Sequence, residues 1–163
     1  MKTKLFIYAI ISWMSITFAY AQTYNLGDVV VNPDGSRGVV FYINPQKDGG
    51  WIMAMSDASS SCQWGTNVDI PDLPNQDIPF PSSHNLLLEL DGYANTQKIR
   101  NFQNNNPSYA AGVVDFDHGW YLPTGGQLRI LMSNLALIES SLVSAGGTSL
   151  SRNSHYWTST EIS

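Results

Sequence analysis

The chain has 163 residues, with 8 basic and 13 acidic side chains and a formal net charge of −5. Only 13% of the residues are charged, against about 25% in an ordinary domain, and 12% are aromatic. The acidic balance disfavours binding to nucleic acid or anionic membrane, because no basic patch is available to displace counterions from phosphates. A surface made largely of Asn, Ser, Gln, Thr and Gly suits the outside of a cell and contacts with sugars or proteins.

The first residues have the layout of a secretory signal peptide. Lys2 and Lys4 precede an apolar run over residues 5–18, and a small-x-small triplet ends at Ala21. The run is shorter than the roughly 20 residues of a spanning helix, which favours a cleaved Sec-type signal over a membrane anchor or an uncleaved amphipathic helix. We expect cleavage after Ala21, then a single domain over residues 22–163. That product is secreted or placed at the cell surface or in the periplasm, and it does not insert into a membrane.

Cleavage would also change the charge. Lys2 and Lys4 leave with the signal peptide, so six basic residues face thirteen acidic ones and the net charge becomes −7. The one cysteine, Cys62, cannot form an internal disulfide, although export would permit one. Its neighbours Ser61, Gln63 and Trp64 supply no base, so a buried structural thiol is favoured over a catalytic one.

Residues 24–56 predict a β-meander, because short β-branched and aromatic runs alternate with turns rich in Asn, Pro and Gly. The strands are expected at residues 29–31, 39–43 and 51–55. Residues 57–85 predict a long surface loop, since four prolines between residues 71 and 81 exclude a helix interior or a central strand there.

Two helices follow in the sequence. The first is predicted over residues 93–102, with Asn95, Ile99 and Phe102 on one face. The second begins after Thr124, which with Gln127 has the spacing of a capping box, and it continues through apolar residues at helical intervals to Leu142. A bend is expected near Asn134. A polar loop then leads to a closing strand over residues 156–161, where aromatic and hydroxyl side chains favour extended structure.

Three stretches together resemble one family of bacterial secreted modules. They are GVVFYINPQKDGGWIMAMSD with QWG (38–57 and 63–65), DGYANTQKI (91–99), and GWYLPTGGQLRIL with YWTSTE (119–131 and 156–161). The resemblance is to the Lcl C-terminal-like domain family, which is similar to the Fibrobacter succinogenes major paralogous domain. It covers nearly all of residues 26–161. It implies an α+β, C-type-lectin-like fold with an N-terminal β-meander, two helices and the strand YWTSTE.

In the resembled family, further strands follow this last strand, whereas here only Ile162 and Ser163 remain. The resemblance therefore implies that the final hairpin is missing. Three explanations stay open: a truncated gene product, a natural short form with a re-paired sheet, or an edge that receives a strand from a partner.

The closing strand carries the first candidate site. On a strand, Trp157, Ser159 and Glu161 would share one face and Thr158 and Thr160 the other. One interpretation makes Trp157 part of the core and lets the hydroxyls and Glu161 bond to loop backbone. The other places Ser159 and Glu161 in a ligand pocket or a calcium site. Calcium is not supported, because no dense acidic loop adjoins Glu161.

Two other groups are weaker candidates. Asp115 and Asp117, next to His118, could bind a metal, although a polar turn is the favoured interpretation. Trp64, at the start of the proline-rich loop, is the tryptophan most suited to contact a ligand, because indole rings stack on sugars and anchor interfaces. We therefore expect no cofactor, and we name Trp64, Ser159 and Glu161 as candidate ligand contacts.

These features predict a non-enzymatic binding or adhesion domain with a glycan or extracellular protein as its ligand. The sequence has no nucleophile elbow, no zinc-protease motif and no phosphate-binding glycine loop. One alternative is a structural accessory subunit that a partner's strand completes. The other is an enzyme related to formylglycine-generating folds, which the isolated Cys62 fits poorly.

Overall fold

The computed structural model describes residues 23–73, 75–76, 89–150 and 154–162. The predicted signal peptide and its cleavage site after Ala21 lie outside these ranges. In chain order the elements are β1 (Val29–Val31), β2 (Arg37–Ile43), β3 (Gly50–Ala54), β4 (Asn75–Gln76), α1 (Gly92–Phe102), α2 (Ala110–Val113), the 3-10 helix η2 (Phe116–His118), α3 (Gly125–Ser133), α4 (Leu135–Ser144) and β5 (Glu161–Ile162). The class is α+β, as the sequence predicts, and no helix among the described residues is long and apolar enough to cross a membrane.

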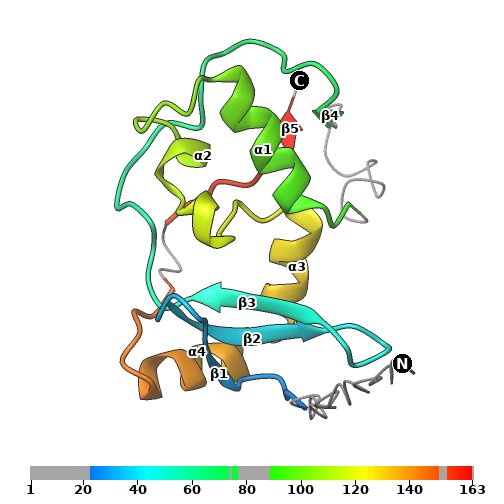
Figure 1. Cartoon of the computed structure of the whole chain (residues 1–163), viewed down its shortest axis with the longest axis vertical. Coiled ribbons are helices and arrows are strands. Elements are labelled where there is room, and N and C mark those ends of the chain that lie inside the picture. The colour runs from blue at the N-terminus through cyan, green and yellow to red at the C-terminus, as the bar shows by residue number, and fades with distance from the viewer. Residues whose placement is uncertain (1–22, 74, 77–88, 151–153, 163) are drawn as a thin grey trace, which may run out of the picture.

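The lower half of Figure 1 is a three-stranded antiparallel sheet in the order β1-β2-β3, with α4 against it. The predicted β-meander is confirmed, and its two turns lie in the segments that contain Pro and Gly. Val29 pairs with Val39, and Val39 pairs with Met53 on the other side. A register shift between Val40 and Tyr42 interrupts the second ladder.

The core of this half, which we call the lower core, joins β2 to α3 and α4. It is built from fully apolar side chains: Val39, Phe41, Leu131, Ile138 and Leu142. The second predicted helix is in fact two helices, because the backbone at Asn134 leaves the helical region (φ −110°, ψ 13°) and separates α3 from α4. The capping box is confirmed: Gln127 N donates to Thr124 Oγ1 at 3.1 Å, and Thr124 N donates to Gln127 Oε1 at 3.0 Å.

The upper half of Figure 1 contains α1, α2, η2 and long connecting segments. Its core, the upper core, consists of smaller or more scattered apolar residues: Ile70, Leu73, Ile99, Ala110, Ala111 and Leu122. On the predicted face of α1, Asn95 and Ile99 are buried, whereas Phe102 is 41% exposed. Phe102 is the last residue of the helix, and the chain turns there so that Gln103 is buried in its place.

The C-terminal segment returns to this upper half (Figure 1). The predicted strand over 156–161 is wrong for most of its length, because only Glu161–Ile162 is a strand, parallel to β4 with Asn75 opposite Glu161. Ser159, Thr160 and Glu161 are buried in succession, and Trp157 is 48% exposed, so the alternating faces of a strand do not form. The C-terminal segment bonds to several separate loops instead of pairing along one neighbouring strand. The missing final hairpin stays a prediction.

Candidate functional site

Two tryptophans connect the C-terminal segment to the loop that contains Cys62. Trp64 Nε1 donates to the carbonyl oxygen of Thr158 at 2.8 Å, and Trp157 Nε1 donates to the carbonyl oxygen of Cys62 at 2.9 Å. Each indole thus donates to a backbone carbonyl group close in sequence to the other tryptophan. We call the surface formed by Trp64, Trp157 and the backbone between them the tryptophan junction. It joins segments that lie more than ninety residues apart in the sequence.

The two rings of the junction differ in exposure. Trp64 is half-buried and packs against the upper core, whereas 48% of Trp157 is exposed. Gly65, next to Trp64, allows the side chain of Gln103 to approach the backbone, because a Cβ at this position would overlap Gln103 Nε2. Trp157 therefore has its polar N–H turned inward and half of its ring at the surface. The interpretation that made Trp157 a core residue is wrong.

The residues after Trp157 bond to the protein's own backbone. Ser159 N donates to the carbonyl oxygen of Pro123 at 2.8 Å, and Thr160 Oγ1 accepts from Gly125 N at 3.0 Å. Glu161 Oε2 accepts from Ile70 N at 3.2 Å. These contacts pin the C-terminal segment to the start of α3 and to the loop before β4. They agree with the prediction that Thr160 and Glu161 bond to loop backbone.

Ser159 and Glu161 are thus placed beneath the surface. Ser159 is fully buried, and its Oγ has no hydrogen-bond partner among the described residues. Burial raises the pKa of Glu161; the Ile70 N–H bond works in the opposite direction, and the nearby charge of Asp69 adds to the rise. Of the three predicted ligand contacts, Trp64 bonds to Thr158, the neighbour of Ser159, whereas Ser159 and Glu161 bond to Pro123 and Ile70. Direct ligand contact by any of the three stays a prediction.

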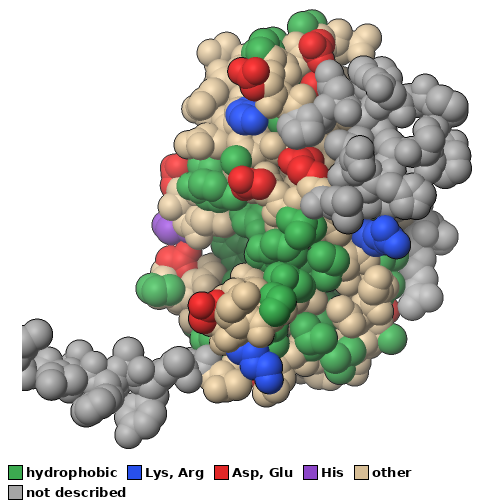
Figure 2. All heavy atoms as spheres, turned by 90° about the vertical axis from the view of Figure 1, so that its right-hand side faces the viewer, with side chains coloured by type: hydrophobic (Ala, Val, Ile, Leu, Met, Phe, Trp, Pro, Cys, Tyr) green, Lys and Arg blue, Asp and Glu red, His purple; other side chains and the backbone are tan. Residues whose placement is uncertain are grey.

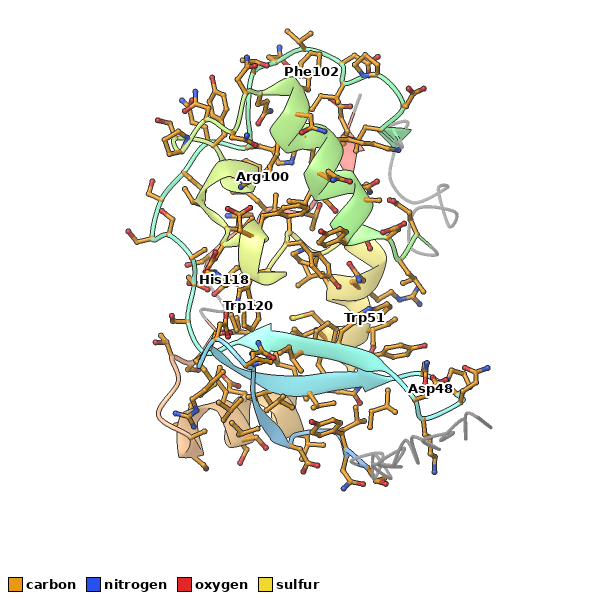
Figure 3. The ribbon with its side chains drawn as sticks, in the orientation of Figure 1. Asp48, Trp51, Arg100, Phe102, His118 and Trp120 are labelled. Atoms are coloured by element: carbon orange, nitrogen blue, oxygen red, sulfur yellow. The ribbon has the colours of Figure 1, made fainter. Side chains whose placement is uncertain are left out.

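The acidic pair Asp115 and Asp117 lies at η2, far along the chain from the junction. Both oxygens of Asp115 lie 2.8 Å from His118 Nδ1, and His118 is labelled in Figure 3. This contact raises the pKa of His118, and the charges of Asp34 and Asp117 add to the rise. Over the part of the chain that the structure describes, no three His, Cys, Asp or Glu side chains are grouped so that they could hold a metal ion.

An aromatic cluster on α1 was not found from the sequence. Tyr93 stacks on Phe116 with ring centroids 4.6 Å apart and meets Tyr121 edge-on at 5.9 Å. Arg100 lies over the Phe116 ring at 5.1 Å and donates to the carbonyl oxygen of Ala111 at 3.0 Å, so it points from α1 toward α2 (Figure 3). The cluster holds η2 against α1. The seven-residue spacing of Tyr93 and Arg100 on one helix face was the only available signal.

Comparison with known proteins adds no relative to this geometry. No protein-family model matches the chain, and no curated protein or solved structure matches it significantly.

Proposed function

We propose that the protein is an exported, non-enzymatic binding domain with a C-type-lectin-like fold, which binds a neutral glycan or an extracellular protein at the tryptophan junction. The observation that carries the proposal is the half-exposed ring of Trp157, whose indole N–H already donates to the Cys62 carbonyl oxygen. The order of elements supports this fold. A β-meander is followed by two helical regions, the second of which begins with a capping box at Thr124, and then by the C-terminal segment.

A fixed, exposed indole is suited to binding. The hydrogen bond from Nε1 satisfies the one polar atom of the ring and limits its rotation, so little side-chain entropy is lost when a ligand binds. The exposed part of the ring is apolar and planar, and indole faces stack on the C–H faces of sugars or anchor protein contacts. Trp157 therefore offers contact area that is already held in place.

The position of the junction supports the same proposal. The two indole bonds join Cys62 and Trp64, in the connection after β3, to Trp157 and Thr158, in the connection after α4. Long loops that a rigid scaffold holds together commonly carry function. The net charge of −7 expected after signal cleavage favours a neutral ligand over an acidic polysaccharide.

Binding can be tested on arrays of neutral glycans and matrix proteins with the purified protein. We expect a signal that Trp157→Ala weakens about thirtyfold, which corresponds to a loss of about 2 kcal/mol of binding free energy for an anchor residue. Leu137→Ala is the matched control, because Leu137 is 49% exposed but lies on α4. No signal above background at high protein concentration, or an equal loss in both variants, would contradict the proposal.

A second candidate function is that of an accessory subunit completed by a partner's strand. It is favoured by β1, which lies at the edge of its sheet and exposes 38% of Val29 and 64% of Val31. An open strand edge is a template for pairing with another chain. Size-exclusion chromatography distinguishes the two functions. Elution of the purified protein as a monomer would contradict strand exchange between chains.

An enzyme related to formylglycine-generating folds is the least supported function. Cys62 is half-buried against the upper core, and its carbonyl oxygen is bonded to Trp157. Such a thiol has the environment of a packing residue. In any assay that detects turnover, full activity of a Cys62→Ser variant would exclude the thiol chemistry on which this function depends.

A further inference from the structure

A hollow of about 490 Å³ lies in the lower half and shares no residue with the tryptophan junction. It is formed by the segment before β1, the end of β2 and the turn between β2 and β3. Its lining includes Tyr24, Leu26, Tyr42, Ile43, Lys47 and Asn134. Figure 2 faces the end of the molecule where the β2–β3 turn lies, and hydrophobic side chains gather across the middle of that face. The volume is within the usual range for small-molecule sites.

The walls of the hollow are mainly apolar and partly aromatic. Phe41 is 6% exposed and forms its floor, while Leu26 and Ile43 add aliphatic surface. Tyr42 is held by stacking on Trp51, with centroids 4.2 Å apart and planes 26° apart. Tyr24, 37% exposed, stands at the rim. A flat apolar ligand would find the preformed aromatic wall of Tyr42, the Phe41 ring as its floor and aliphatic surface beside them.

Five polar residues also line the hollow: Thr23, Asn25, Asn44, Lys47 and Asn134. The amide groups of the three asparagines already donate to other groups of the protein. Lys47 forms no salt bridge within the described ranges, so its ammonium is available as a hydrogen-bond donor. Two carboxylates bond to lining residues: Asp28 accepts from Asn25 N at 2.7 Å, and Asp48 accepts from Asn44 Nδ2 at 2.6 Å. Both Asn25 and Asn44 line the hollow. The two negative charges beside lining residues make an anionic ligand unfavourable.

We propose that this hollow binds a small, uncharged aromatic molecule with a hydroxyl group, of the phenol type. The ring stacks on Tyr42 over Phe41, and the hydroxyl accepts from Lys47 at the edge. A sugar fits less well, because its hydroxyl groups would lose water against Leu26 and Ile43 without gaining partners. The site is independent of the glycan or protein contact proposed at the tryptophan junction.

Saturation-transfer difference NMR on the purified protein tests the proposal with three probes: p-cresol, benzoate and methyl β-glucoside. We expect saturation transfer to p-cresol, with a signal at least threefold stronger than for the other two. Signals from the glucoside or from benzoate that exceed the p-cresol signal would overturn the ligand class. No transfer to any probe at millimolar concentration would overturn the site.

Two variants locate the binding. Tyr24→Ala removes a rim wall and is expected to weaken the p-cresol signal at least threefold. Lys47→Gly removes the donor at a position with φ of 60°, where glycine is conformationally favourable, so the fold is retained. We expect Lys47→Gly to lower the p-cresol signal and leave that of toluene unchanged. Trp157→Ala is the control and should leave p-cresol binding intact; a p-cresol signal that disappears in Trp157→Ala and persists in Tyr24→Ala would contradict the assignment.

Discussion

The two halves of the molecule are stabilised by different kinds of contact. The lower core consists of large apolar side chains between a sheet of local hairpins and two consecutive helices. The upper half buries polar side chains next to a core that includes two alanines. Its contacts connect α1, the start of α3, the loop before β4 and the C-terminal segment. The buried polar residues are Asn95, Thr96, Gln103, Thr124, Gln127, Ser159, Thr160 and Glu161.

This difference has a physical consequence for mutation. Apolar packing depends on volume and tolerates small changes of shape, whereas a buried hydrogen bond depends on one donor and one acceptor. Thr96 illustrates the second kind: its Oγ1 donates to Gly92 O at 2.7 Å and accepts from Leu122 N at 3.0 Å. We therefore expect the lower half to respond to cavities and the upper half to the loss of single polar atoms.

The largest effect is expected from a cavity in the lower core. Ile138 is fully buried, so Ile138→Ala removes apolar contacts that the surrounding residues cannot restore. We expect it to lower the free energy of unfolding by about 2–5 kcal/mol. Urea unfolding followed by circular dichroism measures the change. Leu137→Ala is the control, since its neighbour Leu137 is 49% exposed and should change stability by less than about 0.5 kcal/mol. A loss for Ile138→Ala that equals the loss in this control would contradict the packing described for α4.

The next effect concerns Thr124, which connects the upper half to α3. Its Oγ1 accepts from Gln127 N and donates to the carbonyl oxygen of Glu89 at 2.5 Å. Thr124→Ala removes both bonds, and we expect a loss of about 1–2 kcal/mol. Thr124→Ser keeps the hydroxyl and should recover most of the stability in the same thermal unfolding measurement. If serine destabilises the protein as much as alanine does, the hydroxyl contacts are not the cause.

The indole bond of Trp64 gives a third, smaller effect. Trp64→Phe keeps an aromatic ring in the upper core but leaves the Thr158 carbonyl oxygen without its donor, at a cost of about 1 kcal/mol. Trp51→Phe is a matched control, because the Trp51 ring stacks on Tyr42 and its Nε1 makes no hydrogen bond within the described ranges. Chemical denaturation of both variants measures the difference. Equal losses would show that ring size, rather than the N–H group, determines the effect.

The sequence predicted the lower half well because its signals are local. The turns after Val31 and Ile43 and the capping box at Thr124 each specify the structure of their own neighbourhood. The upper half depends on partners far apart in the chain. Nothing near Trp157 indicates that its N–H will find the Cys62 carbonyl oxygen, and the strand-like residues of the C-terminal segment bond instead to Pro123, Gly125 and Ile70. Tertiary contacts there override strand propensity.

The smallest effect is a pH dependence carried by Glu161. Burial places the folded-state pKa of Glu161 above its ordinary value of 4.5, so the folded protein holds this proton more tightly than the unfolded chain. The resulting stabilisation is complete below the unfolded pKa and is lost as the pH rises through the folded pKa. Glu161→Gln keeps an acceptor for Ile70 N and cannot ionise, so we expect its stability relative to the wild type to increase from pH 4 to pH 7. Glu89, whose pKa is also raised by burial, is present in both proteins, so comparing their unfolding curves isolates Glu161. A difference between the two proteins that stays constant over this range would show that Glu161 ionises alike in the folded and unfolded chain, and that the C-terminal segment leaves its carboxylate in water.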